Sequence, residues 1–142
     1  MAACGGNYIG NKPNEPPFLL KLVMGDGYQD GRQIFRYKLG SPAVVNCSIE
    51  NGTASRQSFK IKTTDNDIFK IRPVMAIVEP NASVPVSITF KAEKPGENCR
   101  HFLAFYNTKV PADGARKAKD YWANGRAEGV TRIIVRFEEE KK

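Results

Sequence analysis

Short segments in which every second residue is apolar recur along this chain, and proline, glycine or asparagine bounds nearly all of them. Residues 84–90 are the clearest case, because valine, isoleucine and phenylalanine alternate there with proline, serine and threonine. A repeat of two residues is typical of a strand with one buried face. Seven or eight such segments, at intervals of about ten residues, predict an all-β sandwich of immunoglobulin type.

The remaining elements are expected from the same kind of pattern. The sequence predicts strands at residues 18–24, 45–49, 59–62, 69–72, 100–108 and 133–137, a strand of mixed parity at 33–39, and a short apolar piece at 75–78. The stretch from Ala112 to Ala123 differs, because alanine, tyrosine and tryptophan recur there every three or four residues. That spacing predicts a short helix over one end of the sheets, with Trp122 as a packed anchor and not a binding platform.

The chain has 142 residues, which is the length of a single domain. We expect a flexible leader at residues 1–17, one domain at residues 18–138 and a charged tail at residues 139–142. The leader has neither the basic start nor the apolar stretch of a secretory signal, and no run approaches the roughly 20 apolar residues of a membrane helix. These features predict a cytoplasmic protein without membrane insertion.

Residues 58–80 form a basic stretch with the alternation of two strands. Lys60 and Lys62 alternate with apolar residues in its first half, and Lys70 and Arg72 do so in its second half. We interpret the halves as short strands that face each other across a polar turn at residues 63–67, with an apolar floor under a positively charged surface. The alternative is that these side chains only solvate the sheet and prevent edge pairing.

The composition and the motifs of the chain favour a binding protein over an enzyme. The net charge of +7 favours acidic partners, but no helix carries a basic stripe and no RNP-like aromatic pair lies on adjacent strands, which argues against nucleic acid. The single histidine, His101, has no nucleophile motif beside it, and there is no phosphate-binding glycine motif. Three scattered cysteines fit neither a disulfide framework nor a zinc site. We therefore expect a binding protein with free thiols, no cofactor and no enzymatic activity.

Two segments resemble a known family. The segment FKIKTT, residues 59–64, resembles the major sperm protein (MSP) domain family, which includes the nematode sperm cytoskeletal proteins and the VAP membrane-contact receptors. The segment RPVMAIVEPNASVPVSITF, residues 72–90, is similar to the family's middle strands, and the likeness extends from about Phe18 to about Glu138. The resemblance implies an immunoglobulin-like sandwich of seven strands that works by protein contact and not by catalysis.

The closer resemblance is to the sperm branch. Residues 107–115 are similar to its N-T-P-D-G-A motif, and Trp122 followed by Gly125 and Gly129 is similar to its W-F-Q-G-D-G-M-V segment. VAP receptors continue into a coiled coil and a membrane anchor, whereas this chain ends soon after its last predicted strand, so we expect no membrane tethering. The resemblance implies a protein of the nematode sperm motility cytoskeleton in the sperm pseudopod, either an MSP filament component or an accessory filament-binding protein.

The VAP branch implies an alternative function, a soluble adaptor for acidic FFAT-type peptides. The residues that this resemblance places in the partner site are Lys60, Lys62, Thr63, Thr64, His101, Leu103 and Arg132. His101 stands in place of a lysine, and Leu103 stands in place of the methionine that lines the pocket. A histidine with an ordinary pKa of about 6.5 is mostly neutral at pH 7, which weakens one contact to an acidic peptide.

Strand parity leads to the same patch. Lys60 and Lys62 share one face of their strand, and we assign outward parity to His101 and Leu103 on theirs. Arg132 opposes an inward isoleucine. If these strands adjoin, they form one basic patch around an exposed leucine and Phe105, where an acidic strand or turn could dock. The alternative is a solvated face without a partner, and the unreadable registers of the edge strands leave a homodimer open.

Overall fold

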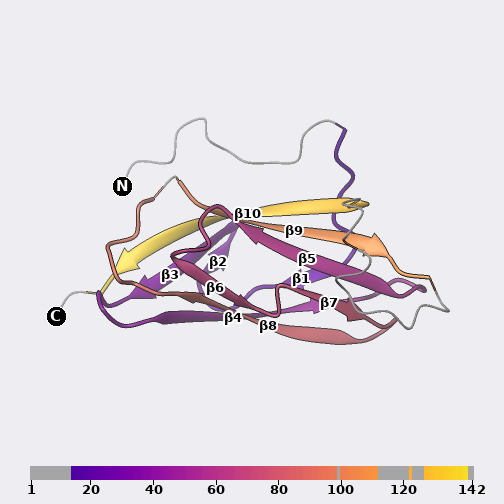
Figure 1. Cartoon of the computed structure of the whole chain (residues 1–142), viewed down its shortest axis with the longest axis horizontal. Coiled ribbons are helices and arrows are strands. Elements are labelled where there is room, and N and C mark those ends of the chain that lie inside the picture. Colours follow the sequence, from indigo (N-terminus) through magenta and orange to yellow (C-terminus); the bar gives the residue numbers. More distant parts are fainter. Residues whose placement is uncertain (1–13, 99, 112–121, 123–126, 141–142) are drawn as a thin grey trace.

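Two β-sheets lie face to face in the computed structural model, which describes residues 14–98, 100–111, 122 and 127–140 (Figure 1). The strands are β1 (Lys21–Val23), β2 (Tyr28–Gln29), β3 (Arg32–Tyr37), β4 (Ala43–Glu50), β5 (Gln57–Thr63), β6 (Phe69–Arg72), β7 (Met75–Val78), β8 (Ser83–Phe90), β9 (Phe102–Lys109) and β10 (Gly129–Glu139). One sheet has the order β1-β4-β8-β6 and the other has the order β2-β3-β10-β9-β5-β7. The predicted all-β sandwich is confirmed.

The four-stranded sheet follows the alternation of the sequence. In β8, Val86 and Ile88 are buried, whereas Ser87 and Thr89 are only half-buried and lie on the outer side. β4 pairs with β8 in antiparallel fashion, with Val45 opposite Ile88. One face of this sheet is therefore apolar and packs on the second sheet, while its other face is polar.

The six-stranded sheet is built around β10. Its first half pairs antiparallel with β9, and its second half pairs parallel with β3. β9 pairs antiparallel with β5 on its other side. Because residues directly opposite each other share a face, one set of side chains from these strands fills the core and the other set forms a continuous outer face.

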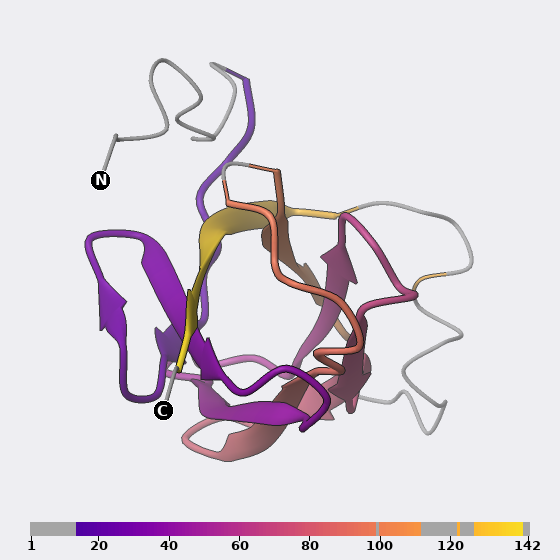
Figure 2. The same ribbon diagram turned by 90° about the vertical axis from the view of Figure 1, so that its left-hand side faces the viewer.

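The strands of the two layers surround a central space (Figure 2). Buried aromatic side chains form a large part of the core between these layers. The ring of Phe90 lies 4.5 Å from that of Phe137 and 5.0 Å from that of Tyr37, measured between centroids. Phe69 stacks on Phe137 at 6.1 Å. These rings come from both sheets, so they join the layers, and truncating one such phenylalanine to alanine typically costs about 3–5 kcal/mol.

The two halves of the basic stretch belong to different sheets, so the prediction that they face each other as neighbouring strands is wrong. β5 pairs with β7 and β9, whereas β6 pairs with β8. A turn in which Phe69 donates its N–H to the carbonyl of Asp65, at 3.3 Å, lies between them. Ile61 and Ile71 are both buried in the core, but in opposite layers, which explains why both halves show the same alternation.

Residues 15–19, which we call the N-terminal strap, run along the first half of β10. Pro17 forms a parallel bridge with Val130, and the N–H of Phe18 donates to the carbonyl of Val130 at 3.1 Å. Gly129 permits this approach, because a Cβ at that position would collide with the carbonyl of Pro17. The strap thus covers part of the same strand that contributes Arg132 to the predicted site.

Candidate partner-binding face

Cations from three strands gather on the outer face of the six-stranded sheet. We call this set, Arg32 of β3, Lys60 and Lys62 of β5, and Arg132 and Arg136 of β10, the basic face. Lys62 and Arg132 lie opposite Ala104 on its two sides, so all three share one face of the sheet. The structure therefore brings together three of the predicted site residues: Lys60, Lys62 and Arg132.

Aromatic rings lie close to the ammonium groups of Lys60 and Lys62. The Nζ atom of Lys62 lies 5.6 Å from the ring centroid of Tyr106, and that of Lys60 lies 5.9 Å from the ring of Trp122. The indole N–H of Trp122 donates to the Oγ atom of Ser58 at 2.9 Å, and the side chain is buried. Trp122 is thus a packed anchor, as predicted, whereas the rest of the helix predicted at residues 112–123 lies outside the described residues. Cation–π contacts of this kind restrict where the ammonium groups can lie.

Arg132 forms an ion pair with another residue of the same chain. Its guanidinium donates to both carboxylate oxygens of Glu15 in the N-terminal strap, at 2.7 and 3.0 Å. The side chain of Arg132 is only 11% exposed, and that of Glu15 is 25% exposed. The hydrogen bond to Glu15 raises the pKa of Arg132, so the guanidinium stays charged. An acidic ligand at this position would have to compete with an internal carboxylate.

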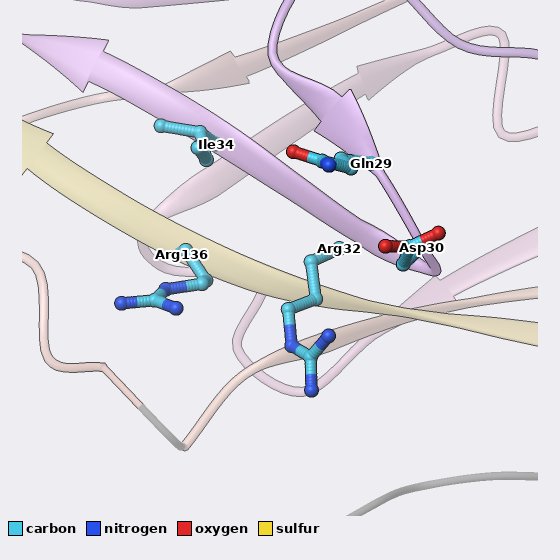
Figure 3. A pocket seen from close by; sticks show the side chains of 5 residues that line it. All are labelled: Gln29, Asp30, Arg32, Ile34 and Arg136. Carbon is cyan, nitrogen blue, oxygen red and sulfur yellow. The ribbon is translucent and has the colours of Figure 1, made fainter. Parts of the chain in front are cut away.

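Arg32 and Arg136 belong to this face but were not among the residues predicted from the sequence. Their guanidinium groups extend to the same side of the sheet and, together with Ile34 of β3, border a depression of about 360 Å³ (Figure 3). Gln29 and Asp30 of the β2–β3 hairpin line its other side. The parallel register of β3 and β10, with Ile134 opposite Arg32, brings these arginines together. No local pattern reveals such a pairing, because the residues that pair, such as Arg32 and Ile134, are 102 positions apart in the sequence.

Leu103 does not lie on the basic face, so the prediction that this leucine is exposed is wrong. It is fully buried, and so is Phe105, two residues further along β9. Leu103 lies opposite Thr63 on one side and Ile133 on the other, and all three point toward the core side of the sheet. The outward set on β9 is instead Phe102, Ala104 and Tyr106, because Ala104 lies opposite Lys62 and Arg132.

His101 and Thr64 meet at the end of the sandwich, away from the centre of the basic face. The Oγ1 atom of Thr64 lies 2.8 Å from Nδ1 of His101 and accepts the N–H of Phe102 at 3.4 Å. The imidazole packs edge-on against Phe69 and Phe137, with centroid distances of 5.9 and 6.0 Å. Thr63, which lies opposite Leu103 in the sheet, is half-buried. A role for these residues in binding stays a prediction.

The protonation of His101 should affect stability. Burial against the aromatic rings lowers the pKa of His101, so the folded protein favours the neutral imidazole. Below a pH of about 6.5 the unfolded chain takes up a proton that the folded chain resists, and the free energy of unfolding should fall as the pH decreases. Urea denaturation at pH 7.5 and at pH 5 should show a smaller decrease for His101→Gln than for the wild type. Identical decreases in both proteins would contradict this.

Candidate metal ligands do not cluster in the described part of the chain. It contains no cluster of three or more histidine, cysteine, aspartate or glutamate side chains that could hold a metal ion. Cys47 is a free thiol in the core, and burial raises its pKa to about 11. No helix among the described residues is long and apolar enough to cross a membrane. What the structure does display is a charged, partly aromatic sheet face.

Comparison with known proteins now identifies the family. The family model of the MSP (Major sperm protein) domain matches residues 31–127, more than half of the chain. The chain belongs to the MSP domain family. The MSP fold is that of a non-catalytic interaction family, and relatives of the chain occur in the nematode Caenorhabditis elegans. An uncharacterized protein of Caenorhabditis elegans is 31% identical over 94% of this chain and 84% of its own length.

Three further comparisons relate this chain to proteins of C. elegans. Sperm-specific class P protein 19 of C. elegans is 38% identical over 63 residues, which are 44% of this chain and 55% of that protein. The solved structure of SSP-19, an MSP-domain protein like family member in C. elegans, superposes with a TM-score of 0.60 at 26% identity. It covers 72% of this chain and 91% of SSP-19. WR4, a C. elegans MSP family member, shares the fold, with a TM-score of 0.63 at 20% identity over 87% of this chain and 99% of WR4.

Proposed function

We propose that this protein is a non-enzymatic structural or interaction protein of the nematode sperm motility cytoskeleton. It acts either as an MSP filament component or as an accessory protein that binds MSP filaments in the cytoplasm of the sperm pseudopod. Membership in the MSP domain family and the likeness to sperm-specific class P proteins support this proposal. Its partners are other MSP-domain proteins, reached by contacts of the sheet faces and edges.

The basic face is the observation that carries the proposal. It places Lys60 and Lys62 on the outer side of β5, each beside an aromatic ring that limits its motion. Side chains that are already ordered lose less conformational entropy when a partner binds. Charge complementarity to an acidic surface then supplies attraction and orientation.

Co-sedimentation with preassembled MSP filaments tests this role. The wild type should pellet with the filaments in a saturable manner, and Lys60→Glu/Lys62→Glu should not, because the double substitution turns two attractive charges into repulsive ones. Lys70→Glu/Arg72→Glu is the matched control, since it makes the same change in charge on the opposite outer face. Pelleting of the wild type should also weaken as the salt concentration rises.

Each outcome has a definite meaning. Equal loss in both double variants would show that filament binding is not specific to the basic face. If the wild type fails to pellet, the accessory role is wrong. The second candidate, an adaptor for acidic FFAT-type peptides, would then be tested with such a peptide. The common face of Lys60, Lys62 and Arg132 favours that candidate, whereas the burial of Leu103 disfavours it.

A further inference from the structure

A second cationic surface lies on the other side of the molecule. Lys70 and Arg72 of β6 lie directly opposite Thr89 and Ser87 of β8, on the outer face of the four-stranded sheet. The four side chains line a shallow depression of about 300 Å³. Two ammonium or guanidinium donors and two hydroxyl groups thus surround one small area, and we call this set the β6–β8 patch.

Among the residues that the structure describes, none provides a counter-charge to the cations of the β6–β8 patch. No carboxylate lines the depression, and neither Lys70 nor Arg72 forms an ion pair or a side-chain hydrogen bond within the described residues. Arg36, in contrast, pairs with Glu138, and Arg132 pairs with Glu15. Two like charges side by side on neighbouring residues of the same face repel each other, and a bound anion would remove that cost.

We propose that the β6–β8 patch binds the phosphate group of a phosphorylated side chain in a partner protein. A phosphate ester carries close to two negative charges at pH 7 and has three oxygens that accept strong hydrogen bonds. The ammonium of Lys70, the guanidinium of Arg72 and the hydroxyls of Ser87 and Thr89 supply donors of both charged and neutral kind. A single carboxylate has fewer acceptor positions and about half the charge of a phosphate ester, so it would accept hydrogen bonds from fewer of these four donors.

The open edge of β6 points to a peptide as the carrier of the phosphate. β6 is the last strand of its sheet, and no strand pairs with its outer edge in the described part of the chain. An extended segment that pairs with such an edge gains main-chain hydrogen bonds and holds alternate side chains over the sheet face. A lipid headgroup gains nothing from this edge, and the depression offers no apolar side chain to an acyl chain.

Amide chemical shifts of ¹⁵N-labelled full-length protein test the proposal. The probes are inorganic phosphate and a five-residue peptide with one central phosphoserine between valines, and the unphosphorylated peptide serves as control. Phosphate and phosphopeptide should shift the amides of residues 69–72 and 86–89 saturably. Lys70→Glu/Arg72→Glu should weaken binding by about tenfold or more. Lys60→Glu/Lys62→Glu should leave it unchanged, since those residues lie on the opposite outer face.

Three results would overturn the proposal. Shifts that centre on the basic face would place the anion there. Equal shifts with the unphosphorylated peptide would show that the phosphate is not recognised. Tighter binding to vesicles that contain a phosphoinositide than to the phosphopeptide would assign the patch to a membrane surface. Circular dichroism of each double variant verifies that the fold is intact, so that lost binding is not mistaken for unfolding.

Discussion

Replacing Leu103 by alanine should lower the free energy of unfolding by about 2–5 kcal/mol, the usual range for truncating a buried leucine. Leu103 is fully buried between the sheets and belongs to the same core cluster as Phe105 and Ile133. Removing its side chain takes away apolar surface that folding buries, and it leaves a cavity that neighbours on two strands can close only in part. Equilibrium denaturation in urea measures the loss directly.

Val44→Ala is the matched control for this prediction. Val44 also lies in a strand, but its side chain is 54% exposed on the outer face of the four-stranded sheet, so its truncation should change the stability by no more than about 0.5 kcal/mol. If Leu103→Ala proves as mild as Val44→Ala, Leu103 faces solvent. Leu103 would then again be a candidate residue for the floor of a peptide-binding pocket.

The layers of this fold could be predicted from the sequence because most strands have one apolar face. In β8 the alternation from Val84 to Phe90 matches the burial of its side chains, and β4 behaves in the same way. Which strands are neighbours could not be predicted. Ile61 and Ile71, one from each half of residues 58–80, are both buried. The same alternation results whether two strands share a sheet or face each other across the core.

β9 shows why the candidate site was predicted only in part. Both of its faces carry apolar side chains, since Phe102 and Tyr106 lie outward while Leu103 and Phe105 lie inward. Alternation therefore does not decide the parity of β9, and outward parity for Leu103 was the wrong choice. Lys60 and Lys62, whose strand has a clear apolar face, were placed correctly on the outer side. The sites that follow from local pattern are those on strands with only one apolar face.

Pairs formed between distant parts of the chain account for the rest of the site. Arg32 joins Arg136 through a parallel strand pair. Glu15 reaches Arg132 because the N-terminal strap lies along β10. Residues 1–17 were predicted to be a flexible leader on the basis of their glycine and proline content, which contains no information about an ion pair with a residue far along the chain. The number of free cations on a surface thus depends on the tertiary structure as well as on the composition.

Glu15→Ala should lower the free energy of unfolding by about 1–3 kcal/mol, because it leaves the nearly buried guanidinium of Arg132 without the carboxylate that accepts two of its hydrogen bonds. Glu97→Ala is the control. Its partner Arg100 lies 2.8 Å away, but both side chains are about two-thirds exposed, so the loss should stay below about 1 kcal/mol.

A double-mutant cycle isolates the pair itself. Arg132→Met keeps much of the side-chain volume and removes the charge, so the loss caused by Glu15→Ala should largely vanish when Arg132→Met is already present. If Glu15→Ala costs the same in both backgrounds, the carboxylate acts on some other group, and Arg132 is available to an acidic partner. If the coupling is found, a ligand of the basic face must displace Glu15 before it reaches Arg132, and the binding energy of that ligand is reduced by the strength of the internal pair.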